Sequence, residues 1–161
     1  MALEPLETAE AQSFPTVRQQ SIFLENRVGQ LLRMGQLLQD TDVRILATSV
    51  VYSVDCAIVR MLFDDPDTAY DVLSAARFQV SEAELLAISL PHGKRALLHT
   101  WAALLGAEVN INYMYPLLCR PHDYAAIALC PDDLDGAVRV LTEGQFVLLD
   151  HQDLVNTRYD R

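Results

Sequence analysis

Residues 21–31 of the chain read SIFLENRVGQL, an apolar run that leads through a polar loop and a glycine into the first leucines of a helical pattern. The same succession of residue types returns at an offset of about 66 residues, and the offset lengthens by about two toward the end of each copy. The aligned pairs include Ile22 with Ile88, Leu31 with Leu97, Leu38 with Leu104, Ala69 with Ala137, and Phe78 with Phe146. The chain therefore carries an internal repeat of one structural unit.

Each copy of the repeat predicts the element order strand, helix, strand, strand, helix, strand. In the first copy we expect strands at residues 19–24, 43–51, 54–63 and 78–80, of which the middle two form a hairpin. The first helix is expected to bury one apolar face, made by Val28, Leu31, Leu32, Gly35 and Leu38. The second helix begins with Asp65 as N-cap and Pro66 in its first turn.

The second copy repeats this pattern, with strands expected at residues 88–90 and 146–149, a helix start signal at residues 131–133 and a helix end at Gly144. This order predicts an α+β protein of two ferredoxin-like βαββαβ units, each an antiparallel sheet with both helices on one face. Residues 45–47, 57–59 and 125–129 are apolar on both alternating faces, so the second sheet face also needs a cover. We expect that cover from the sister repeat or from a second chain, and hence a homodimer or higher homo-oligomer.

Composition and charge restrict the partners. The formal net charge is −10, which repels nucleic acids and anionic membranes, and we expect neither as a partner. Cys56, Cys119 and Cys130 lack the spacing of a zinc site or a disulfide framework and are expected to be reduced thiols. Residues 1–15 lack the apolar core of a signal peptide, and no apolar run is long enough to span a membrane, so we expect a cytoplasmic location.

The stretch at residues 21–31, together with the repeat, resembles the ACT domain, and residues 17–154 resemble a tandem ACT-domain protein. Residues 63–67 and 112–115 also resemble stretches of free-standing tandem members. The resemblance implies a regulatory protein that binds an amino acid between paired units, modulates a metabolic enzyme and has no catalytic activity or cofactor. We expect an N-terminal tail at residues 1–16, a first ACT-like domain at 17–82, a second at 83–154 and a C-terminal tail at 155–161.

The resemblance also implies a ligand site in which the loop after the first strand of one unit faces the second strand of its neighbour. Carried over to this chain, the predicted ligand-binding residues are Glu25, Asn26, Arg27, Val28, Gly29, Gln30, Leu31, Asn110, Asn112, Tyr113, Met114 and Tyr115. Unpaired N–H groups at a helix start favour a ligand carboxylate, and an asparagine can both donate and accept. The alternative is that Asn26 and Gly29 only shape a tight turn. In the second copy Arg95 replaces Gly29, so we expect one competent site per chain.

Other candidate residues have simpler interpretations. His92, His99, His122 and His151 lack the spacing of metal ligands, and we expect no metal site. Trp101 is predicted to lie in the core with Leu97, Leu98 and Leu105 on one face of its helix. Tyr113 and Tyr115 share one face of a strand and either pack internally or line an interface or pocket. Two alternative functions stay open: a ligand-free subunit that scaffolds an enzyme complex, and a small enzyme in which Arg27 holds an anion such as an acyl phosphate.

Overall fold

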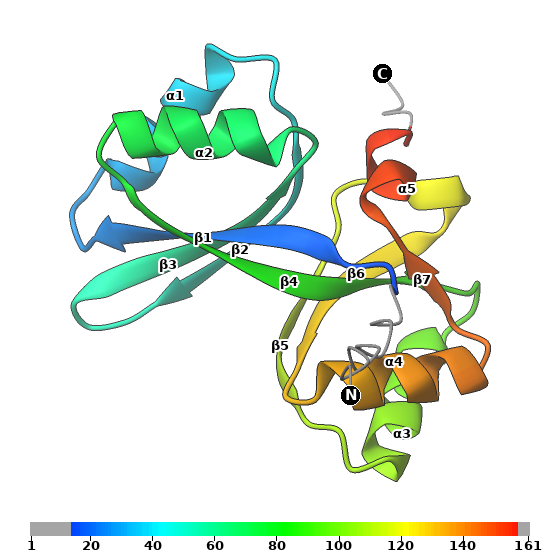
Figure 1. Ribbon diagram of the computed structural model, residues 1–161. Helices are drawn as coiled ribbons and strands as arrows, with labels where there is room; N and C mark the ends of the chain where they lie inside the picture. The colour runs from blue at the N-terminus through cyan, green and yellow to red at the C-terminus, as the bar shows by residue number, and fades with distance from the viewer. Residues whose placement is uncertain (1–13, 158–161) are drawn as a thin grey trace, which may run out of the picture.

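The computed structural model describes residues 14–157 and has the element order predicted for two βαββαβ units (Figure 1). The first unit contains β1 (Val17–Glu25), α1 (Gln30–Gln39), β2 (Ile45–Tyr52), β3 (Cys56–Phe63), α2 (Pro66–Ala75) and the first half of β4 (Gln79–Leu90). The second unit contains the rest of β4, α3 (Ala96–Gly106), β5 (Ile111–Pro116), the 3-10 turn η1 (Pro121–Asp123), β6 (Ala125–Pro131), α4 (Leu134–Glu143) and β7 (Val147–Leu149). A short helix, α5 (His151–Val155), follows. The α+β prediction is confirmed.

All strands join one antiparallel sheet in the order β2-β3-β1-β4-β6-β5, and β7 pairs with β4. Strand β4 belongs to both units: Gln79 to Leu85 pair with β1, and Leu86 to Leu90 pair with β6. The two separate strands expected at residues 78–80 and 88–90 are therefore one continuous strand. The domain boundary proposed between residues 82 and 83 lies inside it.

The helices cover opposite sides of this curled sheet, α1 and α2 on the first unit and α3 and α4 on the second (Figure 1). The remaining faces of the two units turn toward each other and share a third apolar core. The sheet edges meet where Ala47 of β2 forms a bridge to Leu117, and the N–H of Leu118 donates to the carbonyl of Leu46 at 2.8 Å. The second sheet face is thus covered by the sister repeat, one of the two covers predicted.

The N-cap predicted at Asp65 is confirmed, and within the start signal predicted at residues 131–133 the N-cap is Asp133. The Asp65 carboxylate accepts from the N–H and the hydroxyl of Thr68, and the Asp133 carboxylate accepts from the N–H of Gly136. Helix α4 ends at Gly144, but with φ −75° this residue does not need to be glycine for its backbone conformation. The left-handed residue is Gln145, at φ +60°.

The apolar faces predicted for α1 and α3 are wrong for most of their residues, although Leu38 of α1 is buried and Leu97 of α3 packs against the core as expected. Helix α1 buries Met34 and Leu38, while Leu31 and Leu32 are exposed. Helix α3 buries Thr100 and Leu104, and Trp101 is 40% exposed beside exposed Leu98 and Leu105. Each helix shares its sheet face with a second helix, and its fully buried residues are two that stand four apart, with Leu37 of α1 and Leu97 of α3 partly buried beside them. None of the helices within residues 14–157 has the length and apolar character needed to cross a lipid bilayer.

Candidate functional site

The loop after β1 borders a small hollow of about 200 Å³ in the first unit. It is lined by Leu24, Glu25, Asn26, Arg27, Gly29, Gln30, Leu31, Val50, Tyr52, Ala57 and Val59. Six of the seven residues predicted from this loop are among them; Val28 is not, because its side chain projects fully into solvent. The remaining walls come from Leu24 of β1 and from β2 and β3 of the same unit.

The backbone of the loop prepares a site for an anion. The N–H of Arg27 donates to the carbonyl of Glu25 at 2.7 Å, which turns the chain sharply. Gly29 then takes φ +89°, a left-handed conformation that glycine adopts without strain, and α1 begins. No side chain caps α1 and its first turn has no acidic residue. The N–H of Gln30 donates to the carbonyl of Arg27 at 3.4 Å, whereas the N–H groups of Leu31 and Leu32 have no partner among the described residues and are available to a carboxylate at the hollow.

Asn26 also ties the loop to the β2–β3 turn. Its amide nitrogen donates to the carbonyl of Val54 at 3.3 Å, and its amide oxygen accepts a short hydrogen bond from the hydroxyl of Tyr52. Each amide group keeps capacity for one more hydrogen bond, so this anchoring is compatible with ligand contact. Glu25 and Arg27 form an ion pair at 2.6 Å on the exposed surface, where it contributes little stability.

An apolar rim lies in and beside the segments that line the hollow. It consists of the exposed side chains of Val28, Leu32, Val50, Tyr52 and Val54, of which Val50 and Tyr52 also line the hollow. Soluble proteins seldom leave large apolar patches open to water unless another surface covers them. The rim is therefore a candidate contact surface around the hollow.

None of the predicted ligand-binding residues in and beside β5, at positions 110–115, lines this hollow. Tyr113 and Tyr115 stack with their ring centroids 6.5 Å apart, and both hydroxyls bond to Gln19 of β1. Burial raises the pKa of both tyrosines, so the hydroxyls stay protonated at neutral pH. The two rings pack between the units, which is one of the roles left open for them.

The other three predicted residues of this segment lie around β5. Met114 receives the indole N–H of Trp101 at 3.2 Å, on the helix side of the strand. Asn110 and Asn112 are exposed, and β5 is an edge of the sheet. Asn110 and Asn112 are therefore the members of this group that solvent or a second molecule can reach.

The second unit has a different loop at the position equivalent to Glu25–Leu31. Arg95 stands where the first unit has Gly29, and its φ of −109° shows that this loop follows another path. His92, the counterpart of Asn26, packs its ring on Tyr124 with centroids 4.6 Å apart. A different loop is what the replacement of glycine by Arg95 predicts from the sequence.

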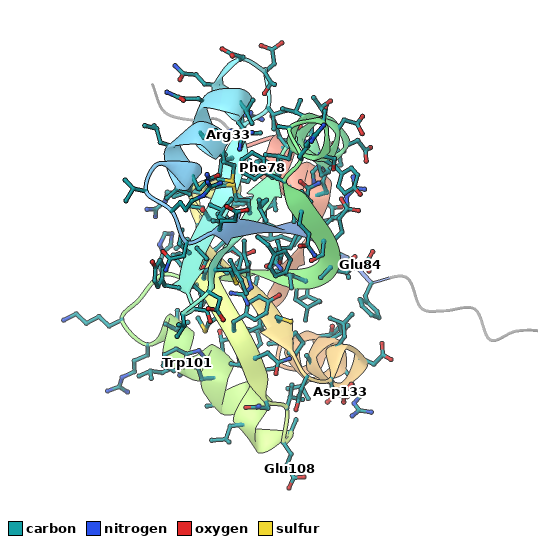
Figure 2. All side chains as sticks on the ribbon, turned by 90° about the vertical axis from the view of Figure 1, so that its left-hand side faces the viewer. Arg33, Phe78, Glu84, Trp101, Glu108 and Asp133 are labelled. Carbon is teal, nitrogen blue, oxygen red and sulfur yellow. The ribbon has the colours of Figure 1, made fainter. Side chains whose placement is uncertain are left out.

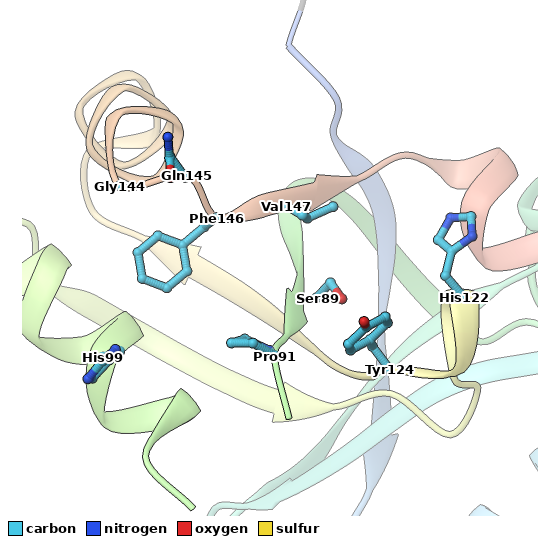
Figure 3. A pocket seen from close by; sticks show the side chains of 9 residues that line it. All are labelled: Ser89, Pro91, His99, His122, Tyr124, Gly144, Gln145, Phe146 and Val147. Carbon is cyan, nitrogen blue, oxygen red and sulfur yellow. The ribbon is translucent and has the colours of Figure 1, made fainter. Parts of the chain in front are cut away.

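A larger hollow, of about 490 Å³, lies at the other edge of the second unit (Figure 3). Four separate segments contribute to it, among them Ser89, His99, Tyr124 and Phe146. No motif marks it, and the sequence analysis missed it. The sequence holds one signal that points to this hollow: when the two repeats are aligned, the shorter His99 stands in the place of Arg33.

The comparisons with known proteins agree with this architecture. A family model described as an ACT domain pair matches residues 15–157. The crystal structure of protein BT0572 from Bacteroides thetaiotaomicron is 30% identical, with a TM-score of 0.79 over 88% of this chain and 96% of that one. A search of curated proteins found no match.

Two more distant structures share the fold. The ligand-free regulatory subunit of aspartate kinase from Thermus thermophilus has a TM-score of 0.55 at 11% identity, over 83% of this chain and 95% of that one. The corresponding subunit from Thermus flavus has a TM-score of 0.52 at 10% identity, over 81% and 94%. With the family match over nearly the whole chain, the repeat and the shared sheet have one explanation: the chain belongs to the ACT domain pair family.

Proposed function

We propose that this chain is a regulatory protein that binds an amino acid at the hollow beside Gly29 and thereby modulates a metabolic enzyme. The observation that carries the proposal is the uncapped start of α1, which opens onto a hollow of about 200 Å³ at a glycine with φ +89°. The carboxylate of an amino acid meets the N–H groups of Leu31 and Leu32 in the first turn of α1, which have no other partner among the described residues. The regulatory subunits of aspartate kinase that share the fold support a regulatory role.

The site is completed by a second copy of the chain in this proposal. Small-molecule sites generally enclose most of their ligand, in cavities of roughly 300–1,000 Å³, and this hollow is smaller and open on one side. The apolar rim supplies a surface for a partner. Exposed Asn110 and Asn112, at the sheet edge, then reach the ligand from the partner and bind its ammonium group with their side-chain oxygens. The protein is a homodimer or a higher homo-oligomer on this basis.

A scaffold subunit is the second candidate, and a specific feature favours it. Leu98, Trp101 and Leu105 form an exposed apolar stripe along α3, remote in sequence from the loop of the hollow. Such a stripe suits contact with another protein whether or not a ligand is bound. A partner that binds with the same affinity in the presence and absence of amino acids would favour this function over sensing.

A thermal unfolding panel against the common amino acids tests the proposal. A ligand that binds only the folded state, at a hundred times its dissociation constant, adds roughly 2.7 kcal/mol of stability, or about 5 to 10 °C in a chain of this size. Gly29→Val should abolish the shift, because a β-branched side chain is strained at φ +89° and blocks the backbone.

Gly35→Ala is the matched control. Its added methyl group meets no atom within 4 Å, and alanine favours the helix, so the variant should keep the full ligand shift. An unchanged panel at millimolar amino acids would refute the sensor function. A shift that survives Gly29→Val would place the ligand elsewhere, and two equivalent sites per chain would contradict the expectation of a single competent loop.

A further inference from the structure

The ends of α2 and α4 have the same backbone geometry, which allows the two units to be compared atom by atom. The N–H of Phe78 donates to Leu73 at 3.0 Å, and the N–H of Phe146 donates to Leu141 at 2.9 Å. The preceding residues, Arg77 and Gln145, are both left-handed, at φ 66° and 60°. A difference in what surrounds the two phenylalanines must therefore come from side chains.

In the first unit the chain fills the space at this point with its own side chain. The guanidinium of Arg33 lies over the ring of Phe78, 5.0 Å from the centroid, and donates to the carbonyl of Ala76 at 3.3 Å (Figure 2). The space beside Phe78 is thus filled by a planar group with N–H donors. This group stacks on the ring and donates a hydrogen bond to the carbonyl of Ala76 at the end of the helix.

In the second unit that occupant is missing. His99 aligns with Arg33, and its shorter side chain makes neither a ring contact nor a hydrogen bond there among the described residues. Gly144 aligns with Ala76, and a methyl group at this residue would lie 2.9 Å from the Phe146 ring. Glycine lets the ring settle against the helix end, and the hollow of about 490 Å³ opens beside it (Figure 3).

We propose that this hollow is a second ligand site, which binds a planar heterocycle that bears N–H donors, of the size of a nucleobase or nucleoside. Its volume falls within the range of roughly 300–1,000 Å³ found for small-molecule sites. The rings of Phe146 and Tyr124 offer stacking surfaces, and stacking on aromatic side chains contributes strongly to the binding of bases. The carbonyl of Gly144 accepts a hydrogen bond from an N–H group of the ligand, as the carbonyl of Ala76 accepts one from Arg33.

The polar groups of the hollow select an uncharged heterocycle. None of its nine lining residues is acidic, although the chain has a net charge of −10, so a simple cation finds no carboxylate there. Ser89 and Gln145 supply donors and acceptors for the edge of a ring. His122 is oriented by Asp153, whose carboxylate oxygen lies 3.0 Å from Nε2, and Nδ1 of the ring is left for a hydrogen bond to a ligand.

Isothermal titration with adenosine, guanosine, cytidine and uridine tests this site. At least one nucleoside should bind, with one site per chain. His99→Arg rebuilds the first unit's arrangement at an exposed helical position and should weaken binding tenfold or more, because the new guanidinium occupies the hollow. Leu105→Arg adds the same side chain at another exposed position of α3 and should leave the affinity within twofold. Circular dichroism verifies that both variants fold.

Any of three outcomes would overturn the proposal. The first is that no nucleoside binds at millimolar concentration, and the second is that His99→Arg leaves the affinity unchanged. The third is that free arginine binds more tightly than every nucleoside. The amino-acid site stands or falls separately, since Gly29→Val should leave nucleoside binding intact.

Discussion

Removing the hydroxyl of Tyr115 should measurably weaken the junction between the two units. Tyr115 is 4% exposed, and its hydroxyl donates to Oε1 of fully buried Gln19 at 2.7 Å. In Tyr115→Phe this oxygen loses the donor and no water can replace it. An unpaired buried polar atom costs about 1–3 kcal/mol, so the urea midpoint should fall by roughly 0.5–1.5 M for a slope near 2 kcal/mol/M.

Tyr113→Phe is the matched control for this substitution. The Tyr113 hydroxyl accepts from Nε2 of Gln19 at 2.9 Å, but that nitrogen also donates to the hydroxyl of Ser21 at 3.1 Å. Gln19 therefore keeps a partner, and since Tyr113 is only half-buried the loss should stay below about 0.5 kcal/mol.

A double-mutant cycle with Gln19→Met completes the measurement by urea unfolding followed by circular dichroism. Gln19→Met leaves the Tyr115 hydroxyl without its acceptor, whereas the double variant removes both partners together. The losses in free energy of unfolding of the two single variants should therefore add up to about 1 kcal/mol or more above the loss in the double variant. Additive effects, or a Tyr115→Phe protein within about 0.3 kcal/mol of the wild type, would show that this hydrogen bond does not stabilise the junction.

Three further predictions concern stability and reactivity. Leu104→Ala should cost about 2–5 kcal/mol in urea unfolding, while Leu105→Ala should change stability by less than about 0.5 kcal/mol, since only Leu104 is buried; equal losses would contradict the observed orientation of α3. Burial raises the pKa of the Cys119 thiol, so iodoacetamide at pH 8 should label Cys119 more slowly than an unfolded reference peptide, as followed by mass spectrometry. Hydrogen bonds from Thr68 lower the pKa of Asp65, so its ionised form stabilises the fold above the unfolded pKa of about 3.9 and this gain is lost as pH falls through the folded pKa. The stability difference between wild type and Asp65→Asn should shrink on acidification below about pH 4, and a constant difference would count against this assignment.

The parts of the fold that depend on local chemistry could be predicted from sequence. The N-caps at Asp65 and Asp133 are contacts within one helical turn, and the βαββαβ order follows from periodicity and the repeat. The orientations of α1 and α3 could not be predicted, because both helices have more apolar residues than one sheet face can cover. Trp101 is an example: it stands at helical spacing from Leu97, Leu98 and Leu105, and only the packing of α3 decides that it faces outward.

The continuity of β4 was also hidden from sequence reasoning. Residues 81–84 read SEAE, a polar stretch typical of a linker, yet they form a strand by pairing with β1 while their side chains stay exposed. Backbone hydrogen bonds rather than burial hold this segment. The same limitation applies to the two hollows: the loop beside Gly29 is one continuous segment and could be found, whereas the hollow beside Phe146 is assembled from four.

Strand β4 has a mechanical consequence for a protein of two binding units. Its 12 residues span about 40 Å without a hinge. The first half pairs with β1, which is the first strand of the first unit, and the second half pairs with β6 and is itself the first strand of the second unit. The units therefore cannot swivel independently as domains on a flexible tether do. A ligand that tilts the sheet of one unit must bend or rotate β4, which is also a central strand of the other unit. A small displacement in one unit is therefore transmitted to the other through the shared strand itself.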